Sequence, residues 1–210
     1  MMKIKQRGRA IILYFCISIL LSLFCVRVYS LSRRFPPATV ENYLCGESVN
    51  IDAKGKYTDG KTVENTFQIT AFNFKVYTKS ELIGEHQLKE DDIPEDRFPQ
   101  YEKRVLMLKA SIKNTSQTEQ VLELYNVNMQ CATLGWSSEV DLDWFKTMNA
   151  ANPKMSLQPS IKPGETLTMF LPYEIDNDNL TNHDFNKIDK EKFDLVLSLY
   201  PKKKLINLNY

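Results

Sequence analysis

The sequence predicts an all-β fold, an antiparallel β-sandwich that follows one transmembrane helix at the N-terminus. After residue 30, short segments alternate between apolar and polar residues with the period of a β-strand, and turn-forming residues separate them. An uncharged apolar run occupies residues 10–26. No segment after residue 30 shows a long helical period, which disfavours a parallel sheet with crossover helices.

Composition narrows the functional class. The 210 residues are enough for one or two domains, and a hydrophobic content of 43% with 25% charged residues is ordinary for a globular protein. Lysine and arginine number 27 against 26 aspartates and glutamates, so the formal net charge is +1. A nucleic-acid-binding protein needs a basic excess to meet phosphates. We therefore expect no nucleic acid among the partners.

The N-terminus reads as a membrane anchor. Four basic residues precede the apolar run: Lys3, Lys5, Arg7 and Arg9. At ~1.5 Å per residue the run of residues 10–26 makes a helix of roughly 25 Å, near the lower limit for crossing a bilayer. The prediction is an uncleaved signal anchor with residues 1–9 as a cytoplasmic basic tail and everything after it extracellular. The alternative is a signal peptide cleaved near residues 28–30, which would give a secreted protein.

A linker and lead-in segment is predicted over residues 27–63, and the sandwich domain over residues 64–210. The Pro36-Pro37 pair stiffens the linker. Residues 43–49 read as a first short edge strand, and residues 52–65 as a polar loop.

The central strand is predicted at residues 104–116. One face carries Leu106, Leu108, Ala110 and Ile112, and Asn114-Thr-Ser ends the strand in a turn. The strand before it, residues 66–78, changes the phase of its alternation. That change predicts a β-bulge, a crossing between two sheets, or two short strands with a kink.

Further strands follow with turns between them. Residues 118–131 are predicted as one or two strands, with Val121, Tyr125, Val127 and Met129 on one side. A helical turn is expected within residues 144–156, ended by Pro153. Pro163-Gly164 predicts a tight turn into a strand over residues 166–175.

The C-terminal part completes the predicted sandwich. Residues 176–189 read as a polar loop, residues 193–199 as a strand, residues 201–204 as a turn, and residues 206–210 as a last strand. About seven short strands in all fit a sandwich.

Three segments resemble a known family: LMLKASIKNTS (106–116), LQPSIKPGETLTMFLPYEI (157–175) and FDLVLSLYPKKK (193–204). They are similar to the immunoglobulin-like, telokin-like extracellular domains of unknown function in Gram-positive bacteria, over roughly residues 40–210. The resemblance implies an immunoglobulin-like sandwich, secreted or anchored to the membrane. The chain lacks the lipobox cysteine of lipid-anchored members, and the family implies no active-site residues.

Two of the four cysteines are candidates for a disulfide. Cys45 and Cys131 lie in the predicted extracellular part, where a disulfide persists. A bridge between them would close a long loop and contribute about 4 kcal/mol in the chain-entropy model. The alternative is two separate buried thiols. Cys16 and Cys25 lie in the apolar run and are expected to be inert.

The sequence predicts no catalytic, cofactor-binding or metal-binding residues. An EF-hand loop beginning at Asp176 fails at its later positions, and the two histidines are too far apart in sequence for a zinc motif. Hydrolase signatures are absent from the sequence. Asp141 and Asp143, near Trp136 and Trp144, fit either a carbohydrate platform with paired carboxylates or a core tryptophan beside surface acids. Lys202 to Lys204 are expected at a hairpin tip.

These observations leave three functional hypotheses. The leading one is a non-enzymatic module, anchored in the membrane through its N-terminal helix, that binds a protein or cell-envelope partner. The second is an accessory factor or enzyme that acts on cell-wall glycans through the region of Asp141 and Asp143. The third is a structural or assembly protein that pairs through a sheet edge.

Overall fold

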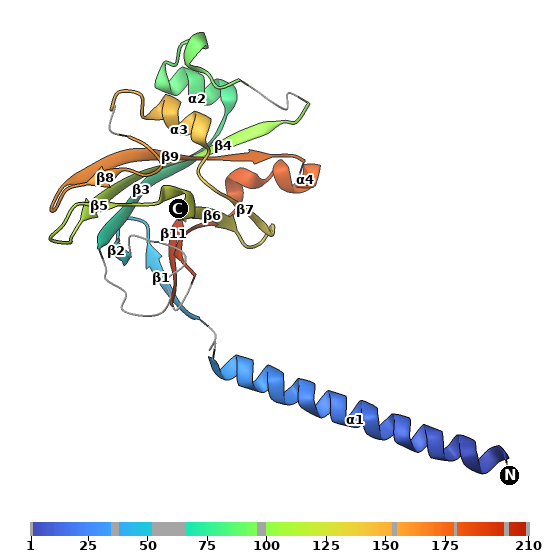
Figure 1. Cartoon of the computed structure of the whole chain (residues 1–210). Helices are drawn as coiled ribbons and strands as arrows, with labels where there is room; N and C mark the ends of the chain where they lie inside the picture. Colours follow the sequence, from blue (N-terminus) through green and yellow to red (C-terminus); the bar gives the residue numbers. More distant parts are fainter. Residues whose placement is uncertain are drawn as a thin grey trace. The chain divides into compact units, whose positions relative to one another are not determined.

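The chain consists of two compact units, residues Met1–Ala38 and Thr39–Tyr210. Our computed structural model describes the following residues: 2–34, 38–51, 66–95, 100–152, 155–178, 180–199 and 202–208. The first unit is one helix, α1 (Met2–Arg34), and the second contains all of the strands (Figure 1).

Helix α1 extends beyond the predicted apolar run at both ends. Its described side chains are those of residues 14, 15 and 17–31, and the large apolar ones among them are exposed. In this described part, no stretch is long and apolar enough to cross a membrane. The side chains of residues 10–13 and 16, which belong to the predicted span, lie outside the described set.

The second unit is a β-sandwich-like fold, as predicted. A five-stranded sheet has the order β1-β11-β10-β6-β7, and a four-stranded sheet has the order β2-β3-β4-β9. The five-stranded sheet consists of β1 (Thr39–Leu44), β6 (Asn128–Cys131), β7 (Trp136–Ser138), β10 (Phe193–Ser198) and β11 (Lys202–Leu208). The four-stranded sheet consists of β2 (Ser48–Ile51), β3 (Phe67–Thr78), β4 (Lys103–Asn114) and β9 (Thr166–Asp176). A two-residue pairing joins β5 (Gln120–Val121) to β8 (Ser160–Ile161).

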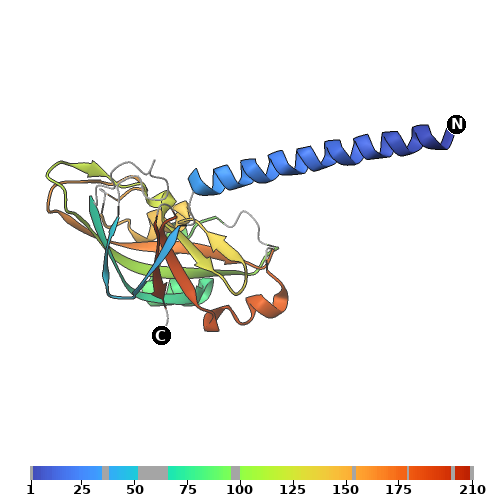
Figure 2. The same ribbon diagram turned by 90° about the horizontal axis from the view of Figure 1, so that it is seen from below.

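One strand pair departs from the predicted antiparallel arrangement. β1 runs parallel to β11, with Thr39 opposite Lys202 and Leu44 opposite Asn207. Figure 2, seen from the side of the five-stranded sheet, shows the two strands next to each other. The predicted single edge strand at residues 43–49 is in fact the end of β1 and the start of β2. They join through a turn in which Gly46 has φ +93°.

The predicted central strand is confirmed. β4 lies between β3 and β9, and Leu106, Leu108, Ala110 and Ile112 are completely buried between the sheets. From β9, the predicted inner face also points into this core: Leu167, Met169, Leu171, Tyr173 and Ile175. Burial raises the pKa of the Tyr173 hydroxyl, which donates a hydrogen bond to the Val127 carbonyl at 3.2 Å.

The phase change in the preceding strand is a bulge. β3 stays in register with β4 up to Ala71, and the register shifts before Phe74. Both halves pair with β4, so β3 does not cross between sheets. This confirms the first of the three interpretations.

The prediction for residues 118–131 is partly wrong. A 3₁₀ turn, η2 (Leu124–Asn126), separates β5 from β6 and shifts which side chains point inward. Val121 and Tyr125 are therefore exposed, whereas Leu122 and Leu124 are completely buried. Val127 and Met129 are buried, as predicted.

The C-terminal segments also need correction. The predicted polar loop contains α4 (Asn182–Phe185) and η3 (Ile188–Lys190), and it buries Leu180, Phe185 and Ile188. Lys202 to Lys204 belong to β11 rather than to a hairpin tip.

Two further helices cover part of the outer face of the four-stranded sheet. α2 (Lys79–His86) was not predicted; it begins at a capping box in which Thr78 and Glu81 bond each other's backbone N–H. α3 (Leu142–Met148) begins two residues before the predicted helical turn. Together with the sheet they bury a second apolar cluster: Tyr77, Leu82, Val105, Met107 and Trp144. Figure 1 shows both helices on the side of β3, β4 and β9 away from the five-stranded sheet. A 3₁₀ turn, η1 (Glu90–Asp92), follows α2.

Candidate functional site

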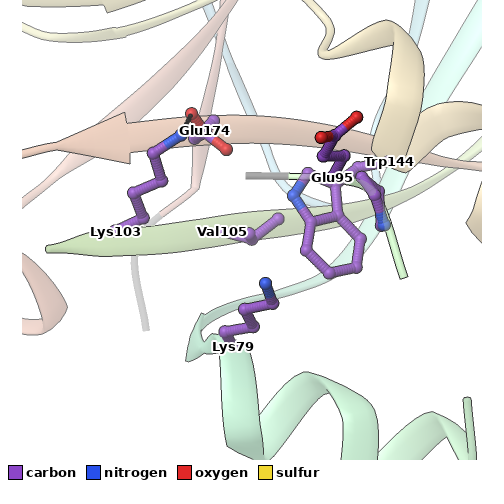
Figure 3. Close-up of a pocket in the computed structure, with 7 residues that line it drawn as sticks. Lys79, Glu95, Lys103, Val105, Trp144 and Glu174 are labelled. Carbon is purple, nitrogen blue, oxygen red and sulfur yellow. Dashed lines mark ion pairs between the residues drawn. The ribbon is translucent and has the colours of Figure 1, made fainter. Parts of the chain in front are cut away.

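A hollow of about 200 Å³ opens on this outer face, beside the N-terminal end of α3. It is lined by residues from four segments: Pro94, Glu95, Lys103, Asp141, Asp143, Trp144 and Glu174. A narrower recess of about 30 Å³ continues from it toward Lys79 and Val105. Figure 3 shows the recess, with the indole of Trp144 between Glu95 and Lys79 and with Lys103 reaching toward Glu174.

An ion pair between neighbouring strands forms one wall. Lys103 begins β4, and Glu174 lies near the end of β9, where the two strands are paired. The Lys103 Nζ is 2.8 Å from Glu174 Oε1, and the two side chains are 16% and 27% exposed. Because this pair is partly shielded from water, it holds the two strand ends more firmly than a fully exposed pair would.

The opposite wall is the start of α3. The Asp141 carboxylate accepts a hydrogen bond from the Trp144 backbone N–H at 2.8 Å and caps the helix. The Asp141 backbone N–H donates to the Pro172 carbonyl of β9 at 2.9 Å. Asp143 lies at the rim, 3.7 Å from Lys146 Nζ and 41% exposed. Asp141 thus fixes the helix to the sheet, whereas Asp143 faces the open side.

The far end of α3 is also fixed to β9. The Asn149 side-chain amide donates to the Phe170 carbonyl and accepts from the Phe170 N–H, both at 2.9 Å. The same amide donates to the Phe145 carbonyl inside the helix at 2.9 Å. Asn149 therefore replaces one residue of a neighbouring strand at this sheet edge, and it holds α3 and the hollow in place.

The charges of the hollow favour a cation. Its main lining has four carboxylates, Glu95, Asp141, Asp143 and Glu174, against one lysine, Lys103. Lys103 offsets Glu174, Lys146 lies 3.7 Å from Asp143, and Lys79 lines the adjoining recess, so a small excess of carboxylate charge remains beside the Trp144 indole. A cationic group with an apolar stem fits both features, because its charge can lie near the carboxylates while its stem packs beside the indole.

The structure brings together some of the residues singled out from the sequence. Asp141, Asp143 and Trp144 all line the hollow, although the two aspartates lie at a helix start and not on a strand. Trp136 lies apart in β7, where its ring contacts Phe193 edge-to-face at 6.0 Å. Glu95, Lys103 and Glu174 were missed. Glu174 occupies an outward-facing position of a predicted strand and could have been indicated by it, whereas Lys103 precedes the predicted central strand.

Of the two alternatives for Cys45 and Cys131, the structure has separate thiols. Cys45 and Cys131 are both free thiols. Cys45 follows β1 and Cys131 ends β6, and β11 and β10 lie between these strands. Three strand spacings of ~4.8 Å place the two residues about 14 Å apart, beyond the reach of a disulfide. The Cys45 thiol donates instead to the Phe72 carbonyl at 2.6 Å, and burial raises the pKa of this thiol.

In the described stretches, no group of three or more histidine, cysteine, aspartate or glutamate side chains is arranged to hold a metal ion. Asn179, part of the segment considered for calcium, lies outside these stretches.

Fold and hollow together define a β-sandwich domain with a helix-covered outer face. Residues 40–204 match the family described as domain of unknown function DUF5028, and the chain belongs to that family. None of the curated proteins compared with the chain matches it. The prediction that the chain belongs to a family of domains of unknown function is confirmed.

Three solved structures are similar to the chain. A conserved hypothetical protein from Bacillus anthracis has 18% identity and a TM-score of 0.42, with 76% of this chain and 97% of that chain covered. An uncharacterized β-sandwich protein from Clostridium difficile 630 has 16% identity and a TM-score of 0.43, with 82% and 96% covered. A functionally unknown protein from Listeria monocytogenes EGD-e has 16% identity and a TM-score of 0.41, with 74% and 79% covered.

Proposed function

We propose that this protein is a membrane-anchored extracellular module that binds, without catalysis, a cationic group of a protein or cell-envelope partner in the hollow beside α3. The observation that carries the binding role is the excess of carboxylates around the Trp144 indole. The proposed location rests on the uncharged run of residues 10–26 behind four basic residues. The immunoglobulin-like form of the sandwich is part of the same proposal and rests on the sequence motifs.

Two contacts favour binding over acid–base catalysis. In glycoside hydrolysis both carboxylates of a catalytic pair must face the substrate. Asp141 is engaged by the Trp144 N–H and Glu174 by Lys103. Both groups support the walls of the hollow, and their loss would distort it.

The location is tested with a cysteine at an exposed turn. Gln117 follows β4 and is exposed. In a chain with Cys16, Cys25 and Cys45 replaced by serine, a membrane-impermeant maleimide is expected to label Gln117→Cys in intact cells as fully as it does after lysis, because the domain lies outside. Cys131, completely buried, is the internal control and should react only after denaturation. Labelling of Gln117→Cys confined to lysed cells would contradict the extracellular location, and recovery in the medium would favour the cleaved form.

The binding role is tested with neutral substitutions at the hollow. Immobilised full-length chain is incubated with solubilised cell envelope, and retained components are quantified by mass spectrometry. Glu95→Gln and Asp143→Asn are each expected to lower retention of a basic partner by about two- to fivefold, since exposed ion pairs contribute little individually. Retention should also fall as salt rises. Asp178→Asn, an exposed carboxylate outside the hollow, is the matched control. Equal retention by all three variants and the unchanged chain would refute the proposed site.

A further inference from the structure

Of the four edges of the two larger sheets, as far as the described residues form them, three are closed or very short. At the β9 edge, Asn149 bonds both backbone groups of Phe170, and Asp141 bonds the Pro172 carbonyl. At the β2 edge, the Lys204 ammonium donates to the Asn50 carbonyl. β7 has only three residues. Proteins close edges in these ways because an open edge pairs with other strands.

The fourth edge, β1, differs because its backbone groups alternate between β11 and the outside. The Cys45 N–H, just past β1, donates to the Asn207 carbonyl of β11 at 3.2 Å. Alternation along a strand then turns the backbone groups of residues 43, 41 and 39 toward β11, and those of Leu44, Asn42 and Val40 outward. The Leu44 N–H confirms this direction, because it meets the Glu47 carboxylate at 2.7 Å outside the sheet. Among the described residues, nothing bonds the outward backbone groups of Val40 and Asn42.

We propose that β1 pairs antiparallel with β1 of a second copy of this chain, about a two-fold axis at Glu41. In this register Val40 of each copy lies opposite Asn42 of the other copy. In each of these two residue pairs, the N–H of either residue donates to the carbonyl of the other. The two pairs together therefore make four hydrogen bonds between the strands, and they use the N–H and the carbonyl of Val40 and of Asn42 in both copies. Glu47, bonded to both backbone groups of Leu44, ends the pairing on the C-terminal side.

The side chains of β1 suit this self-pairing. Val40 and Leu44 share one face and are 53% and 65% exposed. In the proposed register, Val40 lies diagonal to both Val40 and Leu44 of the second copy, within reach of apolar contact. The two copies thus cover each other's exposed apolar side chains on the outer face of the joined sheet.

The charge at the centre of the pairing is already offset. Glu41 faces the other side of β1 and lies 2.6 Å from Lys202 Nζ of β11, and it accepts a hydrogen bond from the Tyr43 hydroxyl at 3.0 Å. The hydrogen bond from Lys202 and its charge lower the pKa of the Glu41 carboxylate. In each copy Lys202 neutralises Glu41, so the two Glu41 side chains at the axis do not meet as unpaired carboxylates.

Disulfide trapping tests the register in the full-length chain in detergent, with Cys16, Cys25 and Cys45 replaced by serine. Residues 41 of the two copies form a non-hydrogen-bonded pair with Cα atoms about 4.5 Å apart, within the range of a disulfide. Thr39→Cys is the matched control on the same face, since two residues 39 lie roughly 13 Å apart in this register. Under mild oxidation we expect roughly tenfold more linked dimer from Glu41→Cys than from Thr39→Cys, as the distances require. Equal trapping of the two variants would overturn the proposal.

An edge-blocking substitution separates this pairing from association through α1. Asn42→Pro removes an outward N–H without removing a bond to β11, so it is expected to abolish the linking of Glu41→Cys. Asn42→Thr keeps the N–H and should leave the linking intact. Undiminished linking in the proline variant would overturn the proposal.

If Glu41→Cys fails to fold, a mixture of Thr39→Cys and Tyr43→Cys chains provides the second opposed pair, and the absence of mixed dimer there would also overturn it. None of these measurements depends on the hollow or on a bilayer.

Discussion

Replacing Asn114 with aspartate is expected to destabilise the sandwich by roughly 3–5 kcal/mol, because it buries an unsatisfied charge. The Asn114 side chain is completely buried. Its Nδ2 donates to the carbonyls of Thr118 and Ile161 at 2.8 and 2.7 Å, and its Oδ1 accepts from the Ser116 N–H at 2.8 Å. In the aspartate variant, an oxygen replaces the donor nitrogen and faces two carbonyl oxygens.

The position of Asn114 explains why the effect should be global. Its backbone N–H donates to the Glu165 carbonyl at 3.1 Å, and its carbonyl accepts from the Gly164 N–H at 2.9 Å. The side chain adds one bond to the carbonyl of Thr118, two residues before β5, and one to the carbonyl of Ile161 in β8. One residue therefore fastens the end of the central strand to the turns that lead into β5 and β9.

The measurement is the free energy of unfolding from urea denaturation followed by tryptophan fluorescence. Asn73→Asp is the matched control, because it makes the same chemical change at an exposed position of β3 and should cost less than about 0.5 kcal/mol. A similar loss of stability in the two variants would show that the buried amide is not a main support of the fold.

The strands were predictable where one face is buried and alternation is regular. In β4 and β9 apolar side chains recur with a period of two, and the structure buries them: Leu106, Leu108, Ala110, Ile112, Leu167, Met169, Leu171, Tyr173 and Ile175. In β3 the bulge after Ala71 was visible as a change of phase. Such patterns are local, so a single sequence contains them.

The helices were harder to predict because they are short. α2 has eight residues and α3 has seven, too few to establish a helical period in the sequence. Their start signals were present, however. Thr78 and Glu81 form a capping box, and Asp141 caps α3. Reading these caps, and not only the period, would have found both helices.

Strand order was not predictable from local patterns. Nothing around residues 39–44 indicates that this strand joins β11 in parallel, more than 150 residues away. For the same reason the sequence could not decide between a disulfide and two separate thiols, since the separation of Cys45 and Cys131 depends on the two strands between β1 and β6. The hollow likewise depends on long-range pairing, since Lys103 and Glu174 meet only when β4 and β9 are in register.

Replacing Asn149 with alanine is expected to cost about 2–3 kcal/mol, because two backbone groups of β9 lose their partners at once. The amide bonds the N–H and the carbonyl of Phe170 and also the Phe145 carbonyl, all at 2.9 Å. Hydrogen exchange gives a local measurement in addition to the free energy of unfolding. The Phe170 amide should exchange much faster in the variant, because the bond that protects it is removed.

The control is Thr147→Val in the same helix, where a hydroxyl bonds the Asp92 carbonyl at 2.8 Å in an exposed position. This substitution should cost less than about 1 kcal/mol and leave exchange at Phe170 unchanged. The comparison separates general weakening of α3 from loss of the contact that holds it against β9. Because α3 carries Asp143 and Trp144, its release should also lower retention of a basic partner at the hollow. Unchanged Phe170 exchange in Asn149→Ala would mean that this sheet edge is protected by something other than the asparagine amide.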